Sequence, residues 1–345
     1  MTDFYYIMFS HCFPVKGAVR SLICNIQSGT YYFIPNDMFE VVSQHRIFNI
    51  TNLVSLWGED NRQSLSSYID LLVLNESVFR VSDPKVLDYF PALDFQYDSP
   101  SVIDNAIIDF NFDYDFFISA ISQLSFLGCR AVLVRILGSI QVEVLDRLLQ
   151  VFDSSSVQHI EILISEPTPM SDNVIEGLFC KYLRLSVISL FGCSKDVVDE
   201  VRIPGGNSEV LGLIKRQAKL YDPLSHCDKI DVNSFILNLP HFSESLSFNT
   251  CLNKKVSIDV KGNVRNCPFM VSVYGNMFKE PLISIVNIPS FKLMWNITKD
   301  KIDVCKDCEF RYMCSDCRAH SENSSDLYSK PKICSYDPYN AKWEN

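Results

Sequence analysis

The chain has 345 residues, a formal net charge of −10 and 47% hydrophobic residues. This length exceeds what one hydrophobic core usually serves, so more than one domain is expected. The acidic balance argues against a general nucleic-acid binder, because phosphate contacts require a basic surface. No apolar run approaches the roughly 18 residues that cross a bilayer, and the first residues lack a signal-peptide pattern. We therefore expect a cytoplasmic protein with no membrane partner and no nucleic-acid partner.

The first 80 residues predict a small α+β segment. RSLICNIQSGTYYFIP (residues 20–35) predicts two strands around a Ser-Gly turn, because β-branched and aromatic residues dominate both halves. NDMFEVVSQH (residues 36–45) predicts a helix with Asn36 as its N-cap and an apolar face. A hairpin that leads into helices is typical of a winged-helix module, so residues 1–80 are interpreted as a winged-helix-like peptide-recognition segment. Prolines among residues 80–101 indicate a connector.

Residues 101–245 alternate between apolar strands and helices. CRAVLVRI (residues 129–136) is a nearly continuous apolar run, and the amphipathic stretch SIQVEVLDRLLQVF (residues 139–152) follows it. Apolar strands joined through helices predict βαβ units and a parallel sheet buried on both faces. Only about four or five such units fit before residue 240, too few for a closed eight-stranded barrel. The predicted fold class is therefore α/β, with a partial (β/α) barrel or an open sheet over residues 101–245.

The third segment, residues 246–345, opens with a predicted hairpin and is rich in cysteine. VSIDVKGNVRN (residues 256–266) predicts two short strands around a Lys-Gly-Asn turn. Seven of the 13 cysteines of the chain lie in this segment: Cys251, Cys267, Cys305, Cys308, Cys314, Cys317 and Cys334. Clustered thiols in a reducing compartment more often ligate metal than form disulfides. Thiolates suit zinc or an iron–sulfur cluster equally well, so the residue types alone leave the metal open.

The spacing of these cysteines resembles that of a SPASM domain, the auxiliary-cluster domain at the C-terminus of radical SAM peptide-modifying enzymes. The likeness rests on the spacing: ten residues separate Cys251 from Gly262, and four more separate Gly262 from Cys267. Two C-x-x-C pairs and a last cysteine, Cys334, follow. CKDCEFRYMCSDCRAH (residues 305–320), with YDPYNAKW behind it, is more similar still to the SPASM-domain peptide maturases of grasp-with-spasm systems. Those systems modify ribosomal peptides and also contain an ATP-grasp ligase.

The resemblance implies two [4Fe–4S] clusters. It assigns the distal cluster to Cys305, Cys308, Cys314 and Cys334, and it gives the proximal cluster three ligands, Cys251, Cys267 and Cys317. No further cysteine lies between Cys251 and Cys267, which leaves one position of the proximal cluster open, and Cys227 beside His226 is a candidate for it. Cys314 and Cys317 are separated by two residues, where the family usually has three.

The radical SAM signature itself is missing. Radical SAM enzymes carry Cys-x3-Cys-x2-Cys in the loop after the first barrel strand, and no three cysteines of this chain have that spacing. The corresponding stretch, DFNFDYDFFIS (residues 109–119), is acidic and aromatic and contains no thiol. RILGSI (residues 135–140) stands where the family usually shows a turn for the methionine of the cofactor. We therefore expect that the chain does not cleave S-adenosylmethionine.

Three functional hypotheses follow. The first is a peptide-maturation protein with an accessory role, which binds a ribosomal precursor peptide and acts with a separate ATP-grasp ligase. The N-terminal hairpin then either adds a strand from the precursor to its edge or only packs on the sheet. The second is an iron–sulfur redox enzyme that acts directly on the peptide. The third is a zinc-bound structural adaptor, because zinc and iron–sulfur sites use the same thiolate ligands.

Overall fold

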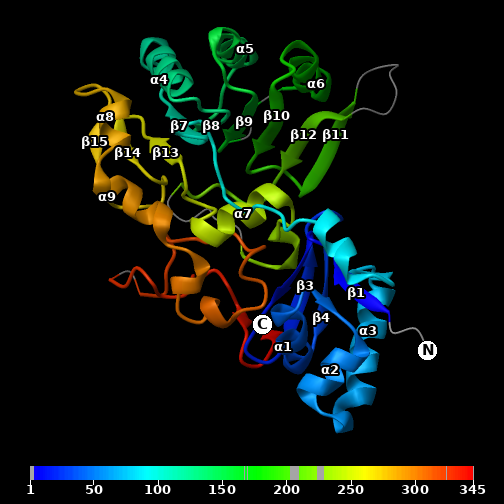
Figure 1. The fold of residues 1–345 in the computed structure, drawn as a ribbon. Helices are drawn as coiled ribbons and strands as arrows, with labels where there is room; N and C mark the ends of the chain where they lie inside the picture. Colours follow the sequence, from blue (N-terminus) through cyan, green and yellow to red (C-terminus); the bar gives the residue numbers. More distant parts are fainter. Residues whose placement is uncertain are drawn as a thin grey trace. The chain divides into compact units, whose positions relative to one another are not determined.

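The computed structural model describes residues 4–166, 168, 170–202, 210–223, 229–323 and 325–344 (Figure 1). The chain forms two compact units, each built from separate stretches of sequence. We call one the cysteine unit, which consists of Met1–Tyr97, Lys229–Thr250 and Ile297–Asn345. We call the other the sheet unit, which consists of Asp98–Asp228 and Cys251–Asn296. The predicted segment 246–345 therefore contributes to both units. None of the described helices combines the length and the apolar character needed to cross a bilayer.

The cysteine unit contains small antiparallel sheets and short helices. One sheet has the order β2 (Cys12–Val15), β3 (Ser21–Asn25), β4 (Thr30–Ile34), and another has the order β5 (Ile47–Phe48), β1 (Tyr5–Met8), β6 (Val78–Val81). A two-stranded ladder joins β16 (Tyr336–Asp337) and β17 (Lys342–Trp343). Its described α-helices are α1 (Asn36–Gln44), α2 (Ile50–Trp57), α3 (Arg62–Leu74) and α7 (Leu239–Ser247).

The predicted N-terminal hairpin and its helix are confirmed, with one correction. β3 and β4 pair antiparallel from Ser21 opposite Ile34, and α1 follows directly. The prediction that Asn36 caps α1 is wrong, because Pro35 is the N-cap and Asn36 is the first helical residue. The Asn36 side chain is engaged elsewhere: its Oδ1 accepts a hydrogen bond from Ser21 Oγ at 2.6 Å, and its Nδ2 donates to the carbonyl of Ala18 at 3.2 Å. The winged-helix arrangement stays a prediction.

The sheet β2–β4 separates two apolar cores of the cysteine unit. Ile23 belongs to the core that α1, α2 and α3 fill, whereas its neighbours Leu22 and Cys24 belong to a second core. This alternation follows from the period of two along a strand, which directs successive side chains to opposite faces. The second core also contains Phe310 and Met313 from the C-terminal cysteine-rich segment. One face of the N-terminal sheet is therefore the surface on which that segment packs.

Among its described residues, the sheet unit is built on nine strands flanked by helices. Their order across the sheet is β11-β12-β10-β9-β8-β7-β13-β14-β15. The strands are β7 (Asn105–Phe110), β8 (Ala131–Ile136), β9 (His159–Ile164), β10 (Leu185–Leu190), β11 (Val197–Arg202), β12 (Val210–Arg216), β13 (Lys255–Ile258), β14 (Asn263–Arg265) and β15 (Gly275–Asn276). The helices are α4 (Tyr114–Phe126), α5 (Val142–Gln150), α6 (Asp172–Lys181), α8 (Leu282–Val286) and α9 (Pro289–Lys292).

The predicted α/β alternation and parallel sheet are confirmed. β12, β10, β9, β8, β7 and β13 run parallel, and Figure 1 shows α4, α5 and α6 side by side along one side of the sheet. The predicted hairpin is β13–β14, and Gly262 supplies the turn residue with φ +75°. The hairpin extends the parallel sheet, because β13 pairs with β7. In the described chain β11 and β15 are the end strands, so the sheet is open; closure into a barrel is not shown.

An ion pair is buried where the first two parallel strands approach their carboxyl ends. Asp109 on β7 and Arg135 on β8 are directly opposite each other in the parallel register, and both side chains are less than 10% exposed. Arg135 binds the carboxylate in a bidentate manner, with Nε 2.6 Å from Oδ1 and Nη2 2.9 Å from Oδ2. Its Nη1 also donates to the hydroxyl of Tyr221 at 3.0 Å. The pairing allows both charges to stay buried.

Removing one partner of this ion pair should lower the free energy of unfolding much more than removing both partners. Arg135→Met leaves the Asp109 carboxylate buried without its cation, and the free energy of unfolding should fall by about 3–5 kcal/mol. The double variant Asp109→Leu/Arg135→Met should recover most of this loss. Anaerobic urea unfolding measures both, with Arg62→Met as the control, since the pair of Arg62 with Glu59 is exposed to solvent and should contribute little to stability. A loss for Arg135→Met no larger than the control would contradict this account.

Candidate metal centre

The cysteine-rich segment of the cysteine unit has little regular structure. Short 3-10 turns cover Lys299–Lys301 and Cys305–Asp307, and in the described residues that follow, the regular structure consists of two isolated bridges and the β16–β17 ladder. Val304, directly before the first cysteine of the segment, has φ +66°. A β-branched residue rarely adopts this left-handed region, which costs on the order of 1–3 kcal/mol and is concentrated at functional sites. The backbone is therefore held in a strained turn at the point where Cys305 leaves it.

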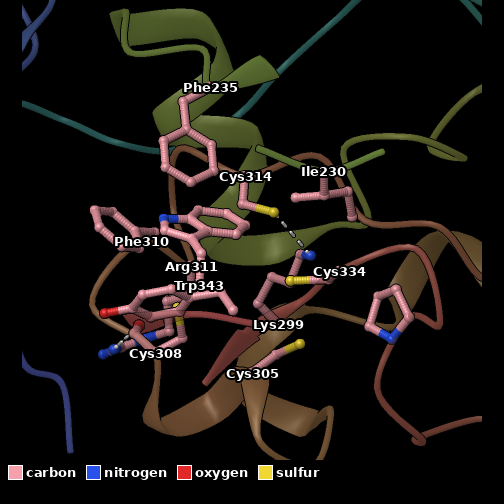
Figure 2. Close-up of a pocket in the computed structure, with 12 residues that line it drawn as sticks. Ile230, Phe235, Lys299, Cys305, Cys308, Phe310, Arg311, Cys314, Cys334 and Trp343 are labelled. Carbon is pink, nitrogen blue, oxygen red and sulfur yellow. Dashed lines mark hydrogen bonds between the residues drawn. The ribbon is translucent and has the colours of Figure 1, made fainter. Parts of the chain in front are cut away.

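Four of the predicted ligand residues line one pocket. Cys305 and Cys308 lie at the two ends of one 3-10 turn, Cys314 and Cys334 come from later parts of the segment, and Figure 2 shows all four around the same space. Cys334 is fixed by a parallel bridge to Ile230, whose backbone NH donates to the carbonyl of Ile333 at 3.1 Å. The rest of the wall is largely apolar and is formed by Ile230, Phe235, Phe310, Pro331, Tyr336 and Trp343. Lys299 and Arg311 add two cations to it. The structure thus brings the predicted distal set together; its role as a ligand set stays a prediction.

The pocket disfavours ionisation of its bare thiols. Burial raises the pKa of Cys305 to about 12, although the charge of Lys299 acts in the opposite direction. Burial likewise raises the pKa of Cys308 and of Cys314. Metals bind the thiolate and not the thiol, so a metal centre formed here would displace protons from these side chains. The donor set, four thiols that share one apolar-walled pocket, fits an iron–sulfur cluster or a zinc ion in its chemistry.

Among the described residues, no three Cys, His, Asp or Glu side chains converge as ligands of a single ion would. A four-iron cluster does not require such convergence, because its four cysteines bind different irons.

The three residues of the predicted proximal set lie in different units. Cys251 and Cys267 belong to the sheet unit, where Lys255 Nζ lies 3.8 Å from Cys251 Sγ. Cys317 belongs to the cysteine unit, and its side chain is buried. Its neighbours in the sequence are Asp316 and Arg318. The grouping of these three cysteines therefore stays a prediction. Cys227 and His226, the candidates for the remaining position, lie outside the described residues.

An ion-pair anchor fixes the cysteine-rich turns to the N-terminal sheet. Glu309, next to Cys308, is buried, and its Oε1 accepts hydrogen bonds from Arg20 Nε at 2.9 Å and from the Tyr336 hydroxyl at 2.5 Å. The Arg20 guanidinium also lies over the ring of Phe33, 3.5 Å from its centre. Burial and the hydrogen bond to Glu309 raise the pKa of Tyr336. Charge-assisted contacts of this kind hold the turn without regular secondary structure.

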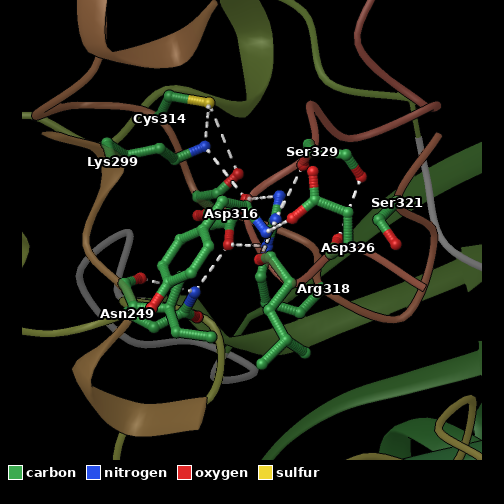
Figure 3. A network of polar contacts seen from close by, with 12 residues as sticks. Asn249, Lys299, Cys314, Asp316, Arg318, Ser321, Asp326 and Ser329 are labelled. Carbon is green, nitrogen blue, oxygen red and sulfur yellow. Dashed lines mark hydrogen bonds and ion pairs between the residues drawn. The ribbon is translucent and has the colours of Figure 1, made fainter. Parts of the chain in front are cut away.

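Sequence reasoning missed a buried polar network beside the pocket (Figure 3). Lys299 Nζ lies 3.4 Å from Cys314 Sγ and 3.5 Å from Asp316 Oδ1. Asp316 also accepts hydrogen bonds from Arg318 Nη2 at 2.8 Å and from Asn249 Nδ2 at 2.6 Å. The one signal that could have found Asp316 and Arg318 is that they flank Cys317; nothing in the local sequence distinguishes Lys299 from its lysine neighbours.

His241 in α7 lies close to this network. Its side chain is buried, and its Nε2 has no hydrogen-bond partner in the described part of the chain. Burial, assisted by the charge of Lys299, lowers the pKa of His241 from 6.5 to about 4. The side chain is therefore neutral at pH 7.

The low pKa of His241 predicts a pH-dependent stability. The unfolded chain binds a proton below pH 6.5 that the folded chain does not bind until about pH 4. The contribution of neutral His241 to the free energy of unfolding is therefore fully present above pH 6.5. It is lost as the pH falls to about 4, which lowers the free energy of unfolding by up to about 3 kcal/mol. His241→Gln should flatten the dependence of the unfolding free energy on pH between 6 and 5 by about one proton, and His159→Gln, at the exposed first residue of β9, is the control. Equal slopes for the parent and His241→Gln would contradict this.

The comparisons with known proteins agree with the thiol chemistry. The SPASM family model, described as an iron–sulfur cluster-binding domain, matches residues 250–309. The matched stretch contains Cys251, Cys267, Cys305 and Cys308 and is a minor part of the chain. No curated protein matches the chain. Residues 250–309 are thus similar to an iron–sulfur cluster-binding domain.

Proposed function

We propose that the chain is an iron–sulfur protein with two [4Fe–4S] clusters. Cys305, Cys308, Cys314 and Cys334 hold the distal cluster, and Cys251, Cys267 and Cys317 supply three ligands of the proximal one. The observation that carries the proposal is the shared pocket of the four distal thiols, two of which lie inside the stretch that is similar to SPASM. When bound, such a cluster supplies one-electron transfer or, where a position is open, a site for a substrate atom.

The residues around the distal thiols suit this role. Phe235, Phe310 and Trp343 cover the pocket with aromatic surface, which limits the access of water. Lys299 and Arg311 add positive charge, which offsets the negative charge of four thiolates. The anchor from Arg20 to Glu309 keeps the turn that carries Cys308 on the N-terminal sheet. Access of solvent and local charge are two of the properties through which a protein sets a reduction potential.

We further propose that the protein takes part in the maturation of a ribosomal precursor peptide together with an ATP-grasp ligase, and does so without S-adenosylmethionine cleavage. The likeness of residues 305–320 to grasp-with-spasm maturases supports the peptide role. The stretch after β7 that has no thiol supports the second part, as does the pair of Asp109 and Arg135 on the strands that would carry the cofactor site. The role is accessory, because the chain lacks the thiol signature of the radical chemistry.

The peptide role is tested by co-purification. The tagged protein should retain a precursor peptide and an ATP-grasp ligase from the same gene neighbourhood when the three are produced together, while a precursor with a scrambled leader should be lost. Retention of neither partner contradicts the peptide role and leaves the iron–sulfur assignment intact. A change in precursor mass with reductant alone, in the absence of the ligase, would instead favour a redox enzyme that acts directly on the peptide.

The iron–sulfur assignment predicts a defined metal and sulfide content. Anaerobically purified protein should contain about eight irons and eight sulfides and absorb broadly at about 400 nm. Cys305→Ser and Cys334→Ser should each lower both contents toward about four, because only one cluster loses a ligand. Cys180→Ser is the matched control, since Cys180 is an exposed cysteine of α6 outside the predicted sets, and it should keep the parent content. Colourless protein with stoichiometric zinc and no sulfide would contradict the assignment and support a structural adaptor.

A further inference from the structure

Lys299 is a buried lysine directly beside a predicted ligand. Its side chain is 6% exposed, whereas lysines are almost never fully buried unless their charge is paired. It lies at the start of a short 3-10 turn, and its ammonium points to the pocket of the four thiols, as Figure 2 shows. The hydrogen bond from Nζ to Cys314 Sγ is 3.4 Å long. The position of this charge requires an explanation in terms of its partners.

The carboxylate near Lys299 is already engaged. Asp316 is 1% exposed, and both of its oxygens contact Arg318, at 2.8 Å from Nη2 and at 2.5 Å from Nε. Asn249 Nδ2 donates to the same carboxylate at 2.6 Å, as Figure 3 shows. The separation between Lys299 Nζ and Asp316 Oδ1 is 3.5 Å, longer than any of these. Asp316 is therefore mainly the partner of Arg318, and the network of two cations and one anion has one positive charge in excess.

The other contacts of Arg318 do not change this balance. Its Nη1 donates to the backbone carbonyls of Leu327 at 3.0 Å and of Ser329 at 2.8 Å, which are neutral acceptors. His241 of α7, which lies near Lys299, is neutral at pH 7, since burial holds its pKa at about 4. Burial acts to lower the pKa of Lys299, but Cys314 and Asp316 raise it above its ordinary value. The surplus positive charge therefore faces Cys314.

A neutral thiol is a poor partner for a buried ammonium, whereas a thiolate is a good one. Cys314 is a thiolate when it ligates a metal. We propose that Lys299 is a positioning residue of the distal centre, which donates a hydrogen bond to the Cys314 thiolate and offsets the negative charge that the centre gains on reduction, so that its reduction potential is raised. This inference rests on the proposed iron–sulfur function and goes beyond it by assigning control of the potential to one side chain.

The direction of the effect follows from electrostatics. In the one-electron couple the electron comes from an external reductant, dithionite in a titration, and no bond is formed or broken by Lys299. The added negative charge is stabilised by a fixed positive charge a few ångströms away, so the reduced form is favoured. Hydrogen bonds to ligand sulfurs act in the same direction. Removing the anion Asp316 from the same network should have the opposite effect.

The test is a redox titration of anaerobic, cluster-loaded protein followed by electron paramagnetic resonance. Lys299→Met should make the distal centre at least about tenfold harder to reduce, a downward shift of about 59 mV for one electron, while the proximal signal keeps its potential. Asp316→Asn should shift the distal potential upward. Lys306→Met is the matched control: Lys306 follows Cys305, but its side chain is half exposed and pairs with Asp303 at 2.9 Å, so the potential should not move.

Lys299→Met protein with the parent iron and sulfide content and the parent potential would overturn the inference and leave the iron–sulfur function standing. If Lys299→Met does not retain its cluster, Asp316→Asn decides: an upward shift supports the proposal, and an unchanged or lowered potential overturns it. Parent protein that holds no iron and no sulfide overturns the proposed function itself. The reversal of sign between the two variants separates a charge effect from a merely structural one.

Discussion

The distal site depends on how a segment with almost no regular secondary structure is held in place. In the described part of residues 297–345, regular structure is limited to short 3-10 turns, the β16–β17 ladder and isolated bridges. The bridge to Ile230 holds Cys334, so other contacts must fix the remaining three thiols. Three other interactions do so. Phe310 and Met313 pack on the face of the sheet β2–β4, Glu309 binds Arg20, and Arg318 ties Asp316 to later carbonyls. A metal bound by the thiols would add a fourth constraint, since its binding free energy is also folding free energy.

This dependence gives the N-terminal hairpin a structural role that its sequence does not reveal. Leu22 and Cys24 lie in the same core as Phe310, so the cysteine-rich turns pack on one face of this sheet. Within the cysteine unit the hairpin therefore packs on the C-terminal cysteine-rich segment. Packing on the parallel sheet and strand addition at the edge of the hairpin both stay predictions. Deleting the first 60 residues would remove the sheet on which these turns pack. A truncation therefore cannot distinguish loss of peptide binding from loss of the fold. Point variants are needed.

Much of the fold could be predicted because local patterns carry it. The apolar runs that became β7, β8, β9 and β10 and the Ser-Gly turn between β3 and β4 are visible within windows of about ten residues. β11 was missed because it is an exposed edge strand that carries Asp199 and Glu200, which hide its pattern. The pairing of β13 with β7 was missed because the two strands are about 150 residues apart.

The candidate site likewise contains residues that local spacing predicts and residues whose role depends on contacts between distant parts of the chain. The spacing of Cys305, Cys308 and Cys314 is local, and the sequence identified these residues together with Cys334. Lys299 and Asn249 could not be found in this way, because their relation to Asp316 exists only after the chain has folded. The buried pair of Asp109 and Arg135 is likewise invisible until β7 and β8 are placed in register. Charged side chains become interpretable only with their partners.

The ligand set of the distal cluster can be tested by anomalous diffraction at the iron and zinc edges from crystals grown under anaerobic conditions. If the four thiols hold a cluster, iron density should be enclosed by the Sγ atoms of Cys305, Cys308, Cys314 and Cys334. A zinc signal at that position, or iron elsewhere with these four thiols free, would contradict this assignment of ligands.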